Sequence, residues 1–166
     1  MRTYDKRFRF WVDVGNAGNR ATLDLLLNKN AMPGFNDSGA HITNMAFFDA
    51  NLMSLKLAQA RSMQTVSTMV KRLTREPAEF FGLDVGTLDI GAQADIVLLD
   101  PQALKDWDSN DTRVLEYREL FKHKQMFNRS EGVVQRVLIN GEPVWQDGQA
   151  TSALGSQRLG RALRAA

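Results

Sequence analysis

The sequence predicts a mixed α/β protein, because helices dominate its first half and short strands and turns its second half. Segment 8–14 is rich in aromatic residues and Val and predicts a strand, and 20–28 carries leucines at helical spacing. Segment 30–35 returns as a second strand, kept brief by Pro33 and Gly34. Strand, helix and strand in this order are typical of a parallel βαβ unit.

Three further helices are expected before residue 83. Segment 45–61 carries an apolar face, and 63–73 repeats apolar residues at helical spacing after Ser62, an expected N-cap. Pro77 suits the first turn of a short helix that ends at Gly82. The methionines of these helices are expected to fill the core.

The second half predicts short strands joined by turns. We expect strands at 85–88 and at 94–99, where an apolar run is bounded by Asp95 and Asp100. Asp95 is expected to have a structural role at a turn. Segments 133–139 and 144–145 predict a hairpin around Asn140-Gly141, a strong turn dipeptide.

Between these strands, 102–125 is charged and irregular, with a helix expected around 114–121. His123 lies there between lysines and is expected to be solvated surface and no metal ligand. The C-terminal segment 152–166 is rich in small residues and arginine.

Composition excludes several classes of function. The 166 residues carry a net charge of only +2 and scattered basic side chains, so we expect no nucleic-acid partner. There is no cysteine, which excludes disulfides and a cysteine-based zinc site. No apolar run is long enough to cross a membrane, so we expect a cytoplasmic protein without a membrane partner.

The segment 32–41 holds the candidate functional residues. A short apolar run leads to Asp37, and Gly39 allows a tight turn before His41. Both side chains could then face one polar site. From the residues alone, a hydrogen-bonded loop pair is the alternative to a base or metal ligand.

Five segments in order resemble the N-acyl-D-amino-acid deacylase (D-aminoacylase) branch of the amidohydrolases. Segment 36–41, Asn-Asp-Ser-Gly-Ala-His, resembles the motif at the eighth barrel strand of that family. Segments 71–83 and 86–100 resemble its "LT-x-x-PA-x-x-FGL" and "G-x-L-x-x-G-x-x-AD-[IL]-V" motifs. Segments 137–141 and 160–164 resemble its closing strands and C-terminal end.

The resemblance implies a fold that is only part of an enzyme. It implies the last βα segments of a metal-dependent (β/α)8 barrel in 1–82, followed by part of a small C-terminal β-sandwich domain in 83–166. A complete barrel takes roughly 200 residues or more, so the barrel here is incomplete. We expect its partner to be the absent N-terminal barrel portion, unless the chain self-associates.

The resemblance also assigns roles to residues. It implies hydrolysis of the amide bond of N-acyl-D-amino acids with zinc or another divalent metal, and Asp37 as general acid/base at the metal-bound water. Asp37 is also a candidate metal ligand, and His41 is expected to orient the loop or Asp37 by a hydrogen bond.

A catalytic zinc site normally needs three protein ligands, and the chain has two histidines. We therefore expect this chain alone to bind no metal and to be inactive. The alternative is a non-catalytic binding or assembly module derived from the same fold.

Overall fold

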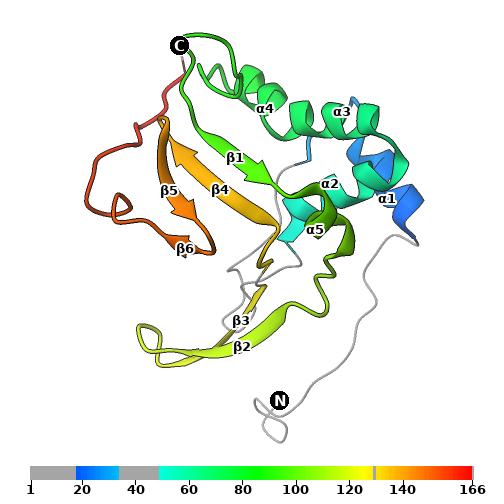
Figure 1. Ribbon diagram of the computed structural model, residues 1–166. Helices are drawn as coiled ribbons and strands as arrows, with labels where there is room; N and C mark the ends of the chain where they lie inside the picture. The colour runs from blue at the N-terminus through cyan, green and yellow to red at the C-terminus, as the bar shows by residue number, and fades with distance from the viewer. Residues whose placement is uncertain (1–17, 34–48, 129, 166) are drawn as a thin grey trace, which may run out of the picture.

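The computed structural model describes residues 18–33, 49–128 and 130–165. Its helices gather beside a four-stranded sheet, and a two-stranded hairpin projects from the other end of the sheet (Figure 1). This arrangement confirms the mixed α/β class. The expected strand 8–14 and the motif residues Asp37 and His41 lie outside the described residues.

The four helices of the first half follow the predicted apolar pattern. Their bounds are α1 Asn19–Leu26, α2 Ala50–Arg61, α3 Met63–Leu73 and α4 Arg75–Phe80. The N-cap of α3 is Ser62, whose hydroxyl accepts a hydrogen bond of 3.1 Å from the Thr65 amide, as predicted. The described part of the expected helix 45–61 becomes helical at Ala50, after Asp49.

Two helix ends differ from the sequence predictions. Gly18 is the N-cap of α1 and Asn19 is already helical, so Asn19 is not the expected cap. Helix α4 begins at Arg75, two residues before Pro77, which still lies in the first turn, where its missing N–H leaves no intrahelical bond unmade.

The first core lies among α1, α2 and α3. Its buried members are Leu23, Leu57, Ala58 and Met69, with Met69 fully buried. Met53 packs against the same cluster. The prediction that methionines fill the core therefore holds for Met69 and Met53, whereas Met63 is 74% exposed.

The four-stranded sheet is antiparallel throughout, in the order β1-β4-β5-β6. Its strands are β1 Ile96–Leu99, β4 Val134–Ile139, β5 Glu142–Gln146 and β6 Gln149–Ala150. The predicted Asn140-Gly141 turn joins β4 and β5, with φ of 51° and 84°. Such positive φ at both turn residues matches a type I′ hairpin.

Asp95 has the structural role that the sequence predicts. Its Oδ1 accepts a hydrogen bond of 2.8 Å from the Asn140 amide, and the Gly141 amide donates to the Ala94 carbonyl at 2.8 Å. These two bonds tie the start of β1 to the β4–β5 turn.

Helix α5, Pro101–Asp106, connects the sheet to the helices. Asp100 caps it by accepting hydrogen bonds of 2.8 Å from the amides of Gln102 and Ala103. The Lys56 ammonium of α2 donates to the carbonyls of Lys105 and Trp107 at its C-terminal end. A second buried cluster fills this junction: Leu52, Leu104, Trp107 and Val133.

The expected helix around 114–121 is wrong. This region forms an antiparallel hairpin of β2 Arg113–Arg118 and β3 His123–Asn128. The segment contains good helix formers, but its side chains alternate between the two faces of the hairpin. On one face Gln125 is buried, and the Arg118 guanidinium lies 4.7 Å from the Phe127 ring centroid. Lys122, with φ of 55°, closes the turn.

The expected strand at 85–88 is also wrong, because this segment packs as a loop on the junction of α3 and α4. Gly86 has φ of 86°, and a Cβ added there would lie 2.8 Å from the Thr74 carbonyl oxygen. Such close approach to another main chain requires glycine and leaves no room for a strand partner. Segment 30–33, the described part of the other brief strand, forms a turn and bend.

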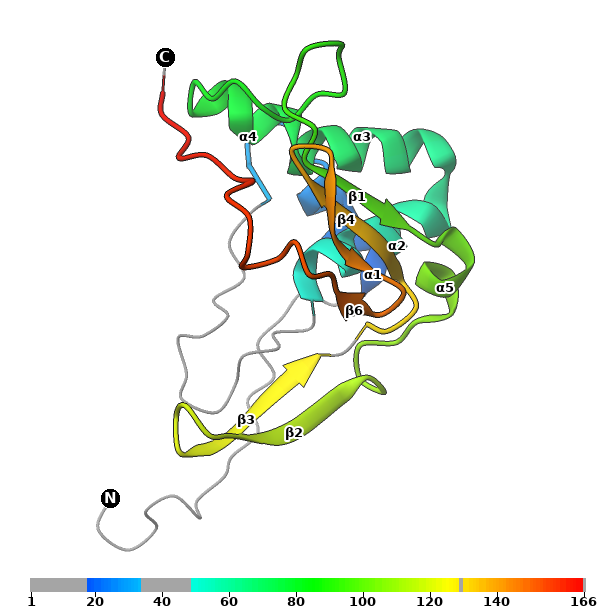
Figure 2. The same ribbon diagram turned by 60° about the vertical axis from the view of Figure 1, so that its left-hand side comes forward.

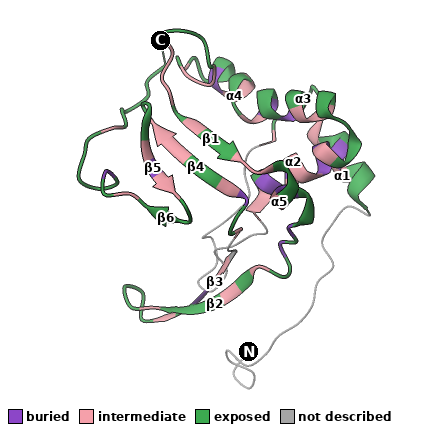
Figure 3. Ribbon diagram, viewed as in Figure 1, coloured by how far each residue is buried: buried purple, intermediate pink, exposed green. Residues whose placement is uncertain are grey.

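Burial is uneven across the described residues. Buried side chains gather on the helices and at the α5 junction, whereas most of the hairpin, apart from Gln125, and much of the sheet are exposed or half-buried (Figure 3). Among the described residues, no helix has the length and apolarity needed to span a bilayer. The division into units 1–82 and 83–166 stays a prediction.

We predict that Met69→Ala lowers the free energy of unfolding by about 2–5 kcal/mol, because it opens a cavity in the first core. Met63→Ala is the matched control on the same helix, and its effect should stay within about 0.5 kcal/mol because Met63 is mostly exposed. Urea denaturation of the two variants measures both values. Equal effects would contradict this packing.

Candidate functional site

The candidate catalytic segment lies between two described anchor points. Asp37 and His41 themselves fall in 34–48, outside the described residues. The chain is described up to Pro33 and again from Asp49. The contacts that hold these two ends are therefore the part of the site that the structure defines.

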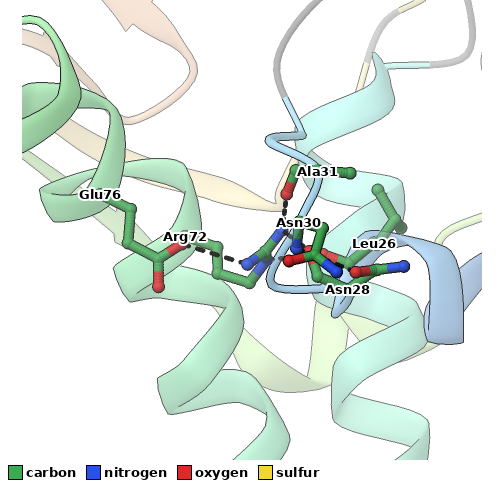
Figure 4. Close-up of polar contacts among 6 residues, drawn as sticks. All are labelled: Leu26, Asn28, Asn30, Ala31, Arg72 and Glu76. Atoms are coloured by element: carbon green, nitrogen blue, oxygen red, sulfur yellow. Dashed lines mark hydrogen bonds and ion pairs between the residues drawn. The ribbon is translucent and has the colours of Figure 1, made fainter.

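Arg72 of α3 holds the end that precedes the motif. Its guanidinium donates to three main-chain carbonyls: to Leu26 at 2.6 Å, to Asn28 at 2.8 Å and to Ala31 (Figure 4). It also pairs with the Glu76 carboxylate at 3.1 Å. The side chain is only 3% exposed.

These contacts satisfy both the carbonyls at the C-terminal end of α1 and the buried guanidinium. The last carbonyls of α1 have no partners within the helix, and a cation is favoured at that negative end of the helix dipole. A buried guanidinium needs several acceptors, and the loop after α1 curls around it to supply them (Figure 4). Segment 26–31 is thereby fixed to α3.

Asp49 holds the end that follows the motif. It is half-buried, has φ of 51°, and its carboxylate accepts a hydrogen bond of 3.3 Å from the Ser130 hydroxyl. Burial raises the pKa of Asp49, and the Ser130 hydrogen bond opposes that rise. The start of α2 is thus connected to the loop that precedes β4.

The described residues do not form a metal site. They contain no group of three His, Asp or Glu side chains that could hold an ion. His123 begins β3, where its Nδ1 lies 3.0 Å from the Lys124 carbonyl oxygen and its ring lies 6.2 Å from Phe121. The expectation that His123 is no metal ligand stays a prediction.

A cleft of about 590 Å³ lies between the sheet and the β2–β3 hairpin. Its apolar lining is Val134, Val137, Val144, Trp145 and Leu154. Its polar lining includes Glu116 of β2 and the loop residues Ser130 and Glu131, so the Asp49–Ser130 hydrogen bond lies next to it. We call this feature the hairpin cleft.

Sequence reasoning missed Arg72, Asp49 and the hairpin cleft. A signal for Arg72 exists, since it lies three residues after Met69 and therefore on the buried face of α3. A charged residue at a core position indicates a set of buried acceptors. Asp49 and the cleft depend on contacts between distant segments, which no local pattern reveals.

Comparison with known proteins identifies the family. The sequence profile of the Amidohydrolase family matches residues 36–144, which is more than half of the chain. The chain belongs to the Amidohydrolase family. The matched region begins at the Asp37 motif and runs through α2, α3, the sheet and the hairpin into β5.

Curated relatives of this amidohydrolase chain are much longer than the chain itself. An uncharacterised protein of Mycobacterium tuberculosis is 35% identical over 123 residues, which are 70% of this chain and 20% of that protein. A dihydroorotase of Geotalea daltonii is 41% identical over 51 residues, 31% of this chain and 12% of the enzyme.

A dihydroorotase of Clostridium acetobutylicum is 31% identical over 83 residues, 50% of this chain and 19% of the enzyme. The amidohydrolase chain thus spans about a fifth or less of these relatives. No solved structure matches it.

We predict that Arg72→Ala lowers the free energy of unfolding by about 3–5 kcal/mol, because it removes the charged partner of Glu76 and a buried donor to three carbonyls. Arg72→Lys should lose part of this, because an ammonium lacks the planar fork. Arg75→Ala, which removes an exposed pair with Glu79, is the control and should have a much smaller effect, because exposed ion pairs contribute little to stability. Urea denaturation measures the effect of each of the three substitutions on stability. An Arg72→Ala effect as small as that of Arg75→Ala would show that the buried Arg72 contacts do not stabilise the fold.

We predict a pH-dependent contribution of Asp49 to stability. Because its pKa in the folded protein lies above the usual 3.8, the folded state holds this proton more tightly than the unfolded chain does. The resulting stabilisation is present below pH 3.8 and is lost as pH rises through the raised pKa. Unfolding by urea from pH 3 to pH 7 should show this loss in the wild type relative to Asp49→Asn; a pH-independent difference would contradict it.

Proposed function

We propose that this chain is the C-terminal portion of a metal-dependent amidohydrolase that cleaves the amide bond of N-acyl-D-amino acids. The observation that carries the proposal is the family match, which begins on the segment that contains Asp37. The ordered D-aminoacylase-like motifs support the substrate class. Relatives that extend well beyond the matched region support the fragment assignment.

Asp37 is the proposed general acid/base. Its carboxylate takes a proton from the hydrolytic water while the water oxygen attacks the amide carbon. It then gives that proton to the nitrogen as the C–N bond breaks, which releases a carboxylic acid and the amine of the amino acid. His41 is the proposed orienting partner of Asp37 or of its loop.

The described residues do not fit a metal centre, since no three candidate ligands meet among them. The proposal therefore places the other ligands of the zinc or other divalent ion in the portion of the enzyme that this chain does not contain. The same reasoning makes the chain inactive by itself. The second candidate function is a non-catalytic binding or assembly module derived from the same fold.

A full-length chimera tests the proposal. The matched segment of the Mycobacterium tuberculosis relative is replaced by this chain, and zinc-supplemented hydrolysis is measured on N-acetyl-D-amino acids, their L enantiomers and dihydroorotate. We predict amidase activity with a preference for the D enantiomers, and none from the isolated chain. Activity of the isolated chain would contradict the fragment assignment, and a preference for dihydroorotate would move the substrate toward that of the dihydroorotase relatives.

Variants of the chimera test the role of Asp37. Asp37→Ala should lower kcat by about 10²–10⁴-fold, the usual contribution of a positioned acid/base. Asp24→Ala, which removes an exposed carboxylate paired with Arg61, is the control and should leave kcat unchanged. An active chimera that tolerates Asp37→Ala would refute the mechanism, and a folded but inactive chimera would favour the assembly module.

A further inference from the structure

The turn between β4 and β5 carries an Asn-Gly pair, a sequence prone to spontaneous deamidation. The main-chain nitrogen of glycine can reach the side-chain amide carbon of the preceding asparagine, because glycine has no side chain to hinder it. In this reaction the Gly141 nitrogen gives its proton to solvent and bonds to Asn140 Cγ, and the Cγ–Nδ2 bond breaks to release ammonia. Water then opens the resulting succinimide to aspartate or isoaspartate. Asn140 and Gly141 are both exposed, so water has access to the pair.

Two hydrogen bonds hold this turn against the segment that precedes β1. The Gly141 amide donates to the Ala94 carbonyl at 2.8 Å, and the Asn140 amide donates to the Asp95 carboxylate at 2.8 Å. The Gly141 nitrogen can attack only after it has lost its proton and turned toward the Asn140 side chain. Both changes break its bond to Ala94, so the native fold opposes the reaction.

A second turn of the same kind lacks these bonds. Asp147-Gly148 joins β5 to β6 at the opposite end of β5. Its φ values are 53° and 77°, close to the 51° and 84° of Asn140 and Gly141. Within the described ranges, the Gly148 amide makes no hydrogen bond to another segment, and a Cβ added at Gly148 would meet no atom within 4 Å. The chain therefore contains a tethered and an untethered turn of similar geometry.

Figures 1 and 2 show what the tethered turn is attached to. In both views the β4–β5 turn lies beside the chain that enters β1, at the end of the sheet away from the β2–β3 hairpin. Strand β1 has four residues and is at the edge of the sheet. The ends of short edge strands open at lower free energy than the centre of a sheet. Opening at the start of β1 would release the Gly141 amide without unfolding the chain.

We propose that Asn140-Gly141 is a self-modification site, at which deamidation is suppressed by the hydrogen bonds to Ala94 and Asp95 and proceeds when the start of β1 opens. Isoaspartate adds a carbon atom to the main chain of a two-residue turn, which the pairing of Ile139 with Glu142 does not accommodate. Its formation therefore prevents the turn from binding the start of β1 as before. The reaction requires only water, so the inference is independent of the proposed function.

The substitution Asp147→Asn allows a matched comparison within one protein, because it places a second Asn-Gly pair in the untethered turn. The variant is incubated in mildly alkaline buffer, and peptide mapping by mass spectrometry follows conversion at positions 140 and 147 in the same sample. In the native chain we expect conversion at position 140 to be about 5- to 100-fold slower than at position 147, the range for two ordinary hydrogen bonds. In urea the two positions should react at similar rates.

The contribution of Asp95 is tested in the same background. Asp95→Ala removes one of the two bonds and should speed conversion at position 140 by about two- to tenfold, while the rate at position 147 stays unchanged. Asp89→Ala, which removes an exposed carboxylate from the loop before β1, is the control and should change neither rate.

Native conversion at position 140 that is as fast as at position 147 would overturn the proposal. So would a folded Asp95→Ala variant with an unchanged ratio of the two rates. Reaction at neither position in the native chain, with reaction at both in urea, would also overturn it, because the turn geometry alone would then be protective. If Asp95→Ala does not fold, the comparison of positions 140 and 147 in Asp147→Asn decides the question.

Discussion

The buried guanidinium of Arg72 is the interaction on which the described structure depends. It is the polar centre of a fold whose first core is otherwise aliphatic, and it joins α3 to the loop after α1 through three carbonyls. A buried cation with this many acceptors has only one favourable position, because every displaced hydrogen bond leaves a desolvated group. The loop that leads toward the Asp37 segment is thus fixed by a residue far away in sequence.

Hydrogen bonds between side chains and distant segments also connect the helices to the sheet. Lys56 of α2 binds the carbonyl end of α5, and Asp49 at the start of α2 binds Ser130 before β4. Leu52 lies between these polar contacts and packs with Trp107 and Val133. The contacts of helix α2 with α5 and with the loop before β4 therefore fix Asp49, the first described residue after the motif segment, relative to the sheet. The chain that ends at Pro33 is thus held through Arg72 of α3, and the chain that resumes at Asp49 is held through the loop before β4.

Sequence patterns predicted correctly those features that depend only on neighbouring residues. The Ser62 cap, the apolar spacing of α3 and the Asn140-Gly141 turn each depend on a few neighbouring residues, and all three are present. The pattern was misleading in 113–118, where Glu, Leu and Arg suit a helix but side chains alternate across a hairpin. It also failed at 85–88, where packing of Gly86 on Thr74 decides the conformation. The partners of Arg72 and the hairpin cleft arise from long-range contacts, so the sequence could suggest Arg72 only through its place on the buried face of α3.

The central claim is that this member of the Amidohydrolase family contributes Asp37 to an active site that another portion of polypeptide completes. A crystal structure of the full-length chimera with a bound N-acyl-D-amino acid tests it most directly, through the distance from the Asp37 carboxylate to the substrate amide nitrogen or the water beside it. The account predicts hydrogen-bond reach, about 2.6–3.2 Å. An Asp37 carboxylate that faces solvent or a main-chain turn, away from the bound amide, would contradict it.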